Sequence, residues 1–271
     1  KGTRIAMEPS SVTGTENLMM AAVLANGVTV IDNAAREPEV ADLATFLVKR
    51  GARIQGYGTD TITIEGVEAL YDGEHHHRIM SDRMEAGTYL IAGVATQGDV
   101  LVRLTSPELL DDLCTKLHAT GAELSKSDGC IRVTMDRRAS AVDVTTAPCP
   151  GFPTDLQAQM GALLSKADGV SLITETVFEN RLTHVSELRR MGANITTKGN
   201  QAKITGVGTL SGAPVMASDL RGGAALILSG LTAEGGTVIS RVYHVDRGYE
   251  HIETKLNTLG ANIRRVKGTN A

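Results

Sequence analysis

The chain of 271 residues contains no tryptophan, and only 3% of its residues are aromatic. Proteins that bind single-stranded nucleic acid stack bases on aromatic side chains, so this class lacks its usual platforms here. Lys and Arg together number 27 against 31 Asp and Glu, which gives a formal net charge of −4. Without a basic excess there is also no electrostatic footprint for a duplex. We therefore expect no nucleic-acid partner.

Long apolar runs are also missing. No stretch approaches the roughly 20 apolar residues that a membrane helix needs, and no signal peptide opens the chain. Cysteine is also scarce, and the three cysteines are Cys114, Cys130 and Cys149. Their odd number and their lack of metal-ligand spacing indicate reduced thiols. These features predict a cytoplasmic protein with no membrane partner.

A short tract that recurs four times dominates what the sequence does contain. Each copy ends a polar helix-like segment with Gly-Ala, and the glycines are Gly51, Gly121, Gly192 and Gly260. The intervals between them are 70, 71 and 68 residues. This period exceeds the roughly 20–50 residues of solenoid repeats, so the copies predict globular α/β units.

A second marker recurs in phase with the first. It is an apolar, small-residue-rich run that predicts a helix buried on all sides, and the runs end at Gly27, Gly98, Gly169 and Gly235. A β-branched strand follows each run, at Val28–Ile31, Val100–Arg103, Val170–Ile173 and Val238–Ser240. A polar helix that ends at the recurrent glycine comes next, and two short strands close the unit. The predicted unit is βαβαββ, with one buried and one surface helix.

The length and one polar stretch predict how the units are grouped. A single core seldom grows beyond roughly 250 residues, so we expect two domains. The best boundary is the polar segment around His75-His76-His77, which gives residues 1–78 as the last unit of an incomplete first domain and 79–271 as a three-unit second domain. Adjacent residues of a strand point to opposite faces, so the three histidines indicate a solvated linker and no metal site. The apolar helix face of the lone unit predicts poor solubility.

The starts of the buried helices carry the candidate chemistry. Three of them open with the same kind of pair: Ser81-Asp82, Thr154-Asp155 and Ser218-Asp219. Helix capping explains each pair taken alone. It does not explain Arg83 and Arg221, because a cation in the first turn opposes the helix dipole. An anionic ligand between the arginines and the free N–H groups would reverse that effect, so we predict a site for phosphate or carboxylate groups.

Two more arginines lie in turns after the same strand of their units. They are Arg181, in Asn-Arg, and Arg247, in Asp-Arg-Gly. Packing of the units would bring them to a common edge. The alternative is weak surface pairing with Glu179 and Asp246. The matching positions favour a shared site.

Five motifs together resemble those of the UDP-N-acetylglucosamine enolpyruvyl transferases, or 1-carboxyvinyltransferases. They are Ser11-Val-Thr-Gly-Thr-Glu-Asn, Asn33-Ala-Ala-Arg-Glu-Pro-Glu, Phe152-Pro-Thr-Asp, Thr174-Glu-Thr-Val-Phe-Glu-Asn-Arg and His244-Val-Asp-Arg-Gly-Tyr-Glu. The resemblance implies an inside-out α/β barrel built from βαβαββ units with buried helices. It also implies transfer of the enolpyruvyl group of phosphoenolpyruvate to the 3-hydroxyl of UDP-N-acetylglucosamine in peptidoglycan synthesis, without a metal or organic cofactor.

The resemblance also implies roles for individual residues. Asp155 matches the residue that contacts the sugar hydroxyl and is proposed as general base. Arg221 and Arg247 match arginines that approach the phosphate or carboxylate of phosphoenolpyruvate and complete the catalytic set. The implied substrate-binding residues are Ser11, Val12, Thr13, Asp155, Val177, Arg181 and Arg83. Pro9 stands where some members place a lysine, so that nucleotide contact is not expected here.

One departure from the family affects the expected activity. Its members carry a proton-donating cysteine in a Gly-Cys-Ala loop, and none of the three cysteines here has that context. We therefore expect the chain to need the missing N-terminal segment and to be inactive alone, and phosphate release by the purified chain would contradict this. Two other functions stay open, a noncatalytic UDP-sugar-binding protein and the related shikimate-pathway enolpyruvyl transferase.

Overall fold

The computed structural model describes residues 1–74, 76–104 and 106–266. By its own contacts the chain divides into two compact units. One is Lys1–Ser81 together with Pro148–Gly151, and the other is Asp82–Ala147 together with Phe152–Ala271.

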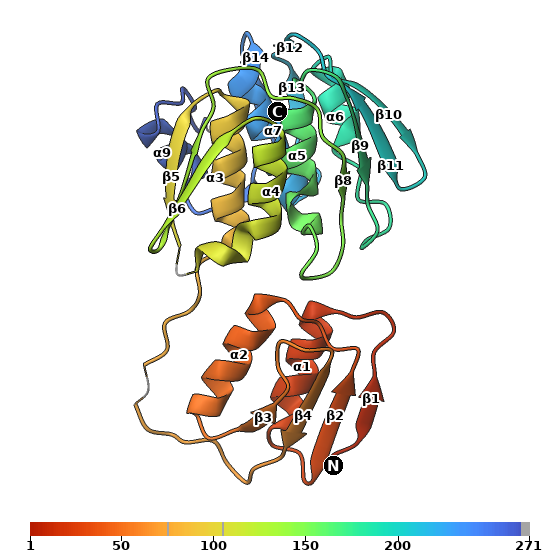
Figure 1. Cartoon of the computed structure of the whole chain (residues 1–271), viewed down its shortest axis with the longest axis vertical. Coiled ribbons are helices and arrows are strands. Elements are labelled where there is room, and N and C mark those ends of the chain that lie inside the picture. The colour runs from red at the N-terminus through yellow and green to blue at the C-terminus, as the bar shows by residue number, and fades with distance from the viewer. Residues whose placement is uncertain (75, 105, 267–271) are drawn as a thin grey trace. The chain divides into compact units, whose positions relative to one another are not determined.

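The first unit is one sheet with two helices (Figure 1). Its elements in chain order are β1 (Arg4–Ala6), α1 (Val12–Ala22), β2 (Val28–Asp32), α2 (Pro38–Lys49), β3 (Arg53–Gln55) and β4 (Thr61–Glu65). The strand order is β1-β2-β4-β3, with β1 parallel to β2 and the other pairs antiparallel. This is the predicted βαβαββ unit.

Helix α1 buries little of its surface although it is mostly apolar. Its buried residues are Thr15, Met19 and Ala22. Met20, in the same helix, and Leu24, just after it, are exposed. The prediction of burial on all sides is therefore wrong for α1, because among the described residues of this unit only α2 and the sheet cover it.

The second unit is built around three helices that pack against one another: α3 (Arg83–Ala95), α5 (Gln157–Leu164) and α7 (Leu220–Thr232). Ten residues of α3, all eight of α5 and eight of α7 are buried. Strands and short helices surround them, so the helices form the core and the sheets the outside (Figure 1). The predicted inside-out α/β architecture with buried helices is confirmed.

Two main sheets cover these helices. The first has the order β5-β7-β6, and the second has the order β10-β11-β9-β8. The strands are β5 (Asp99–Arg103), β6 (Glu123–Ser127), β7 (Cys130–Thr134), β8 (Val144–Thr145), β9 (Val170–Thr174), β10 (Asn194–Lys198) and β11 (Gln201–Thr205). Two parallel pairs complete the unit: β12 (Leu210–Ser211) with β14 (Ala233–Glu234), and β13 (Pro214–Met216) with β15 (Val238–Ser240).

The remaining elements are short helices: η1 (Pro107–Leu110), α4 (Asp111–Ala119), η2 (Thr154–Leu156), α6 (Val185–Arg190), α8 (Tyr243–Asp246) and α9 (Ile252–Thr258). The four recurrent glycines follow α2, α4, α6 and α9 with φ between +91° and +97°. This left-handed conformation is easiest for glycine and ends the helices as the repeat predicted.

Two of the four units lack strands that the repeat predicted. Residues 76–81, which precede α3, form no strand, and neither do residues 261–266, which follow α9. In the first unit β3 pairs with β4 alone. The equivalent of β4 in the fourth unit would lie beyond residue 266, outside the described residues. Residues 261–266 therefore have no described strand with which to pair.

The predicted solvated linker is partly wrong. His77 lies against α2, with Nε2 3.2 Å from Oδ2 of Asp42 and its ring edge-on to Phe46. His76 is exposed, as predicted, and His75 lies outside the described residues. The Phe46 ring offers apolar surface that a histidine ring covers more favourably than water does.

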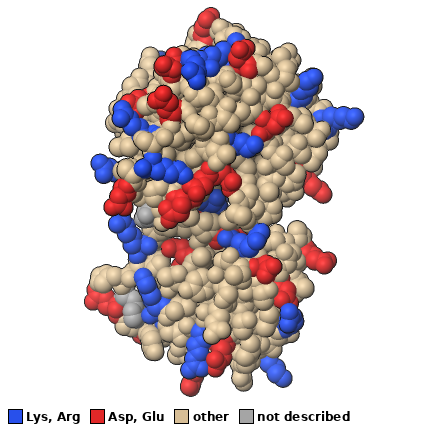
Figure 2. Space-filling view, viewed as in Figure 1, with Lys and Arg blue, Asp and Glu red and all other residues tan. Residues whose placement is uncertain are grey.

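One face of the molecule shows no large area of one charge (Figure 2), and the described helices are not of the membrane-spanning kind. Lys and Arg are interspersed with Asp and Glu over the face shown in Figure 2. No helix within the described ranges is both long and apolar enough to cross a bilayer.

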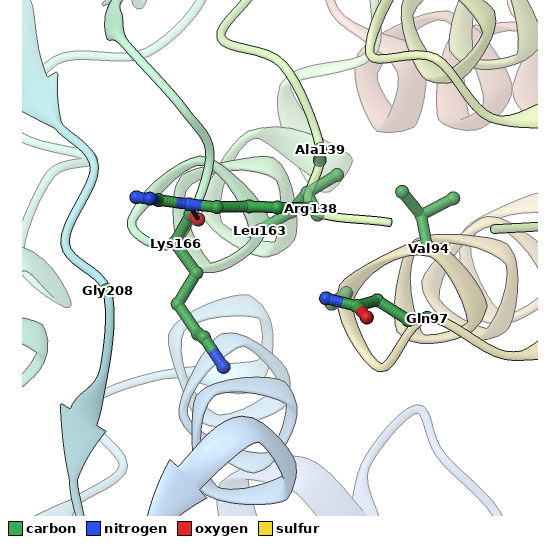
Figure 3. Close-up of a pocket in the computed structure, with 8 residues that line it drawn as sticks. Val94, Gln97, Arg138, Ala139, Leu163, Lys166 and Gly208 are labelled. Atoms are coloured by element: carbon green, nitrogen blue, oxygen red, sulfur yellow. Dashed lines mark hydrogen bonds between the residues drawn. The ribbon is translucent and has the colours of Figure 1, made fainter. Parts of the chain in front are cut away.

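Cations satisfy carbonyl groups where the buried helices end. A cavity of about 90 Å³ lies there, and Arg138 extends across it while Lys166 points toward α7 (Figure 3). Arg138 donates to the carbonyls of Lys166, Ala167 and Val207 at 2.7, 2.9 and 3.0 Å. Lys166 Nζ donates to the carbonyl of Thr232, the last residue of α7, at 3.0 Å. Positive charge suits this end of a helix dipole, which explains the cavity's cations without a ligand.

We expect Arg138→Ala to lower the free energy of unfolding by about 1–2 kcal/mol, because three carbonyl groups lose a charged donor. Arg137→Ala is the control, since Arg137 makes one long bond of 3.4 Å to the carbonyl of Gly121. Urea unfolding of both variants measures the difference. Equal destabilisation by the two variants would contradict the capping role of Arg138.

Candidate functional site

The three aspartates at the helix starts do different things. Asp82 accepts hydrogen bonds from the backbone N–H groups of Met84 and Glu85, at 2.8 and 2.9 Å. Asp219 accepts from the first-turn N–H groups of α7 in the same way, at 3.0 and 2.8 Å. Asp155 makes no cap bond, because η2 follows Pro153 without a side-chain cap. Capping therefore explains Asp82 and Asp219 but leaves the carboxylate of Asp155 available.

Two arginines hold the Asp155 carboxylate from two sides. Arg181 Nη2 lies 2.5 Å from Oδ1, and Arg221 Nη2 and Nε lie 2.8 and 3.2 Å from Oδ2. The Arg221 side chain is 14% exposed and that of Asp155 35% exposed. The structure thus brings together Asp155, Arg181 and Arg221, which the sequence placed 26 and 40 residues apart.

The charges set the protonation state of Asp155. Burial by itself raises the pKa of this carboxyl, but Arg221 and Arg181 outweigh it and hold the pKa below its ordinary value. Burial likewise opposes the charge of Arg221, and Asp155 more than offsets this, so the pKa of Arg221 is raised. Asp155 is therefore ionised at neutral pH, and the three side chains carry one positive charge in excess.

A buried polar cluster fixes Arg221. Arg221 Nη1 donates to the hydroxyl of Tyr249 at 3.4 Å, and its guanidinium lies 5.7 Å from the centre of the Tyr249 ring. The same hydroxyl lies 2.8 Å from Oγ1 of Thr88 and accepts from Nε2 of Gln159 at 3.1 Å. Tyr249, Thr88 and Gln159 are buried. The cluster ties α3 and α5 to the arginine in the first turn of α7.

A second network fixes Arg181. Its Nη1 donates to Oγ1 of Thr154 at 3.1 Å, and Thr154 donates to Oε2 of Glu175 at 2.7 Å. The guanidinium also lies 4.8 Å from the centre of the Phe178 ring. Glu175 is 2% exposed. Beside this network, a cavity of about 310 Å³ is lined by Arg181, Glu175 and Phe178, among others.

Sequence reasoning missed the residues behind the arginines. Gln159 and Thr88 each interrupt an apolar helical run, and Glu175 stands directly after the half-buried strand β9. A polar residue in such a place needs a buried partner, which was the available signal. Tyr249 lay within a recognised motif, but nothing in the sequence showed that it contacts Arg221.

Two further candidate arginines lie at other helix ends. Arg247 follows α8 and is exposed, and its side chain makes no hydrogen bond or ion pair with any residue in the described ranges. The alternative pairing with Asp246 is wrong, because that carboxylate binds Arg265 at 2.7 and 2.9 Å. Arg83 is the first residue of α3 and is partly exposed. Arg181 binds Asp155, so its alternative pairing with Glu179 is not what the structure contains.

The candidates for the sugar-nucleotide site lie in two places. Ser11 caps α1 by accepting from the N–H of Gly14 at 3.1 Å, and Val12 and Thr13 begin that helix in the first unit. Val177 lies in the second unit, where its N–H donates to Oε1 of Glu175 at 2.8 Å. The described residues contain no group of three or more His, Cys, Asp or Glu placed to hold a metal ion.

His184 is a buried imidazole directly before α6, where Asp219 and Arg181 influence its charge. Burial lowers the pKa of His184 to about 4, although the Asp219 carboxylate opposes this shift. The folded-state pKa lies below the unfolded value of 6.5, so the neutral form of His184 is the one that the folded state favours. Above pH 6.5 the histidine is neutral in both states, and its contribution to stability is fully present. This contribution disappears as pH falls from about 6.5 to about 4 and amounts to about 3 kcal/mol.

We expect the free energy of unfolding to fall between pH 6.5 and pH 4, and His184→Gln to flatten that fall because it removes the titrating group. Urea unfolding across this range measures the slope. His118→Gln is the control, since His118 is exposed. Carboxylates such as Asp155 and Asp219, whose pKa values are lowered, lose their contribution at more acidic pH. An unchanged slope in His184→Gln would show that His184 is not the group responsible.

A family model described as EPSP synthase (3-phosphoshikimate 1-carboxyvinyltransferase) matches residues 1–256. The UDP-N-acetylglucosamine 1-carboxyvinyltransferase of Geotalea daltonii is 56% identical over 267 residues, which are 98% of this chain and 64% of that protein. The chain thus spans less than two thirds of the length of this curated relative.

Two solved structures share the fold. The enolpyruvyl transferase NikO from Streptomyces tendae matches with a TM-score of 0.86 and 24% identity, over 97% of this chain and 65% of that one. An EPSP synthase from Acinetobacter baumannii matches with a TM-score of 0.73 and 17% identity, over 96% of this chain and 62% of that one. At such identities these likenesses bear on the fold alone.

Proposed function

The chain belongs to the EPSP synthase family of enolpyruvyl transferases, and we propose that the protein carrying it transfers the enolpyruvyl group of phosphoenolpyruvate to the 3-hydroxyl of UDP-N-acetylglucosamine. The observation that carries the proposal is the ionised Asp155 between Arg181 and Arg221 at the start of a buried helix. One carboxylate can accept a proton there, and two guanidinium groups can bind an anion.

The proposed reaction is an addition followed by an elimination. The sugar oxygen forms a bond to C2 of phosphoenolpyruvate while C3 gains a proton, which gives a tetrahedral phospholactoyl adduct. The C2–O bond to phosphate then breaks as C3 loses a proton, and the products are the enolpyruvyl ether and phosphate. Asp155 accepts the hydroxyl proton in the first step, from a position that the rigid start of α5 fixes.

The arginines link substrate binding to the basicity of Asp155. While both guanidinium groups bind the carboxylate, its pKa is low and it is a weak base. Phosphoenolpyruvate brings a phosphate and a carboxylate that compete for the same donors. A shift of Arg221 or Arg181 toward the substrate would raise the pKa of Asp155 when a proton must be accepted.

The other candidate residues complete this proposal. Arg247, whose side chain has no partner among the described residues, and Arg83 would approach the anionic groups of phosphoenolpyruvate. Ser11, Val12, Thr13 and Val177 would contact the UDP-sugar. We propose that a segment with the Gly-Cys-Ala loop supplies the proton donor and that this chain does not turn over alone. We also propose that residues 1–78 and 79–271 form its two domains.

The acceptor substrate separates the alternatives. The relative with 56% identity is named for UDP-N-acetylglucosamine, whereas the EPSP synthase structures are 16–17% identical. This difference supports the sugar nucleotide over 3-phosphoshikimate as the acceptor. We propose that the reaction takes place in the cytoplasm and is the first committed step of peptidoglycan synthesis. A noncatalytic UDP-sugar-binding protein would not need an ionised base beside two arginines.

We expect Asp155→Asn to lower kcat by about 10²–10⁴-fold, because the amide cannot accept the hydroxyl proton. The measurement is phosphate release that depends on both substrates, made on the whole protein that carries this chain. Asp128→Asn is the control, since Asp128 is an exposed residue of the turn between β6 and β7.

Two results would contradict the proposal. Turnover with 3-phosphoshikimate in place of UDP-N-acetylglucosamine would assign the alternative acceptor. An Asp155→Asn variant that keeps more than about a tenth of the wild-type kcat would remove Asp155 from the role of base.

A further inference from the structure

We propose that Glu175 is a positioning residue that acts through Thr154 to hold the Arg181 guanidinium against Asp155. Glu175 would not touch substrate, because its side chain is buried and both of its oxygens are engaged within the protein. The inference rests on the proposed function and adds to it the group that fixes the geometry of the base. Its evidence is burial, hydrogen-bond direction and charge.

The Glu175 carboxylate is buried without a direct ion pair. Its Oε1 accepts hydrogen bonds from Oγ1 of Thr146 and from the N–H groups of Val177 and Phe178, at 2.9, 2.8 and 3.0 Å. Its Oε2 accepts from Thr154 at 2.7 Å. No Lys, Arg or His of the described residues forms a salt bridge with it. A buried carboxylate costs a great deal unless it is compensated, so these four donors are its support.

The Glu175 carboxylate orients the Thr154 hydroxyl, and the hydroxyl in turn accepts a hydrogen bond from Arg181. Glu175 can only accept, so Thr154 must donate its single hydroxyl proton to Oε2. The lone pairs of the Thr154 oxygen are then left for Arg181 Nη1, which donates to it at 3.1 Å. Arg181 is consequently held on one side by Asp155 and on the other by a hydroxyl that Glu175 has oriented.

The charges support the same role. Asp155, Arg181 and Arg221 carry one positive charge in excess, and the Glu175 carboxylate, one hydroxyl away, balances it. Among the described residues Arg221 has no such anion on the side away from Asp155, where its Nη1 donates to the hydroxyl of Tyr249. When Asp155 takes up a proton it loses its charge-assisted hold on both arginines, and Glu175 still retains Arg181 through Thr154.

The same carboxylate also shapes the loop that carries Arg181. Its bonds to the N–H groups of Val177 and Phe178 tie that loop to the end of β9. Asn200 anchors the other side, because its Nδ2 donates to the carbonyl of Glu175 at 2.7 Å. The buried Glu175 side chain therefore holds both the backbone of the loop before Arg181 and the Thr154 hydroxyl that the Arg181 side chain contacts.

The test is a double-mutant cycle in the whole protein that carries this chain. Glu175→Gln keeps an acceptor for the three donors at Oε1, but its amide group donates to Thr154 where Oε2 had accepted. Thr154→Val removes the hydroxyl and leaves the three bonds to Oε1. Thr154→Ser restores the hydroxyl and is the conservative control. The quantities measured are kcat and KM for phosphoenolpyruvate and the melting temperature.

We expect each of Glu175→Gln and Thr154→Val to lower kcat/KM by about tenfold or more, since misplacement of a positioned group is costly. The double variant should lose no more than the larger single loss, and Thr154→Ser should stay within about twofold of wild type. Fold losses that multiply in the double variant would overturn the proposal. So would a normal kcat/KM in Thr154→Val, or a loss of melting temperature with unchanged kinetics.

A second measurement does not depend on the transferase reaction. The ¹⁵N NMR signals of the Arg181 guanidinium, assigned by their loss in Arg181→Lys, report whether its Nη groups are held. We expect slowly exchanging Nη protons in the wild type and in Thr154→Ser, and averaged ones in Glu175→Gln and Thr154→Val. Unchanged signals in the last two variants would overturn the positioning role. A wild-type protein with held signals but no turnover would instead refute the proposed function alone.

Discussion

The constraint behind the second unit is that its three central helices have no route to water along their sides. Their free N–H and C=O groups can be satisfied only at the ends, so polar and charged side chains gather there. At one end Asp82 and Asp219 accept from first-turn N–H groups. At the other, Arg138 and Lys166 donate to carbonyls. Burial of the helices thus concentrates charge at their two ends, while the buried polar groups between the ends, such as Thr88 and Gln159, are uncharged.

The cluster at Asp155 extends this rule to a group that caps nothing. Arg181 and Arg221 neutralise it, and each arginine has its own support, from Thr154 and Glu175 in one case and from Tyr249 in the other. The two supports differ chemically, because one ends in a carboxylate and the other in a phenol. Arg181 is therefore backed by a carboxylate through a hydroxyl, and Arg221 by a phenol hydroxyl alone.

Much of this frame follows from periodic features of the sequence. The recurrent glycines predicted where α2, α4, α6 and α9 end, because a left-handed residue there is a local requirement. The arginines in matching turns, Arg181 and Arg247, were predicted to converge, but only Arg181 has a described contact with Asp155. Sequence could not predict the partners Glu175 and Tyr249. A single polar residue beside an apolar run does not show which side chain it will contact, because that depends on how the helices pack. It also predicted strands around α3 and α9 that the described residues do not form, because a strand depends on a partner elsewhere in the chain.

The contrast among the three helix starts has a consequence for how such a site can arise. Duplication of a unit copies its capping aspartate along with its fold, and two copies of the cap remain in structural use. In the third copy a proline and a short 3₁₀ turn lead into the helix without a side-chain cap, so that aspartate is spare. An aspartate that caps no helix can be substituted without the loss of a cap, although it occupies the same place in its unit as the two capping aspartates. Redundancy within a repeated architecture therefore separates the residues that maintain the fold from those on which selection for chemistry can act.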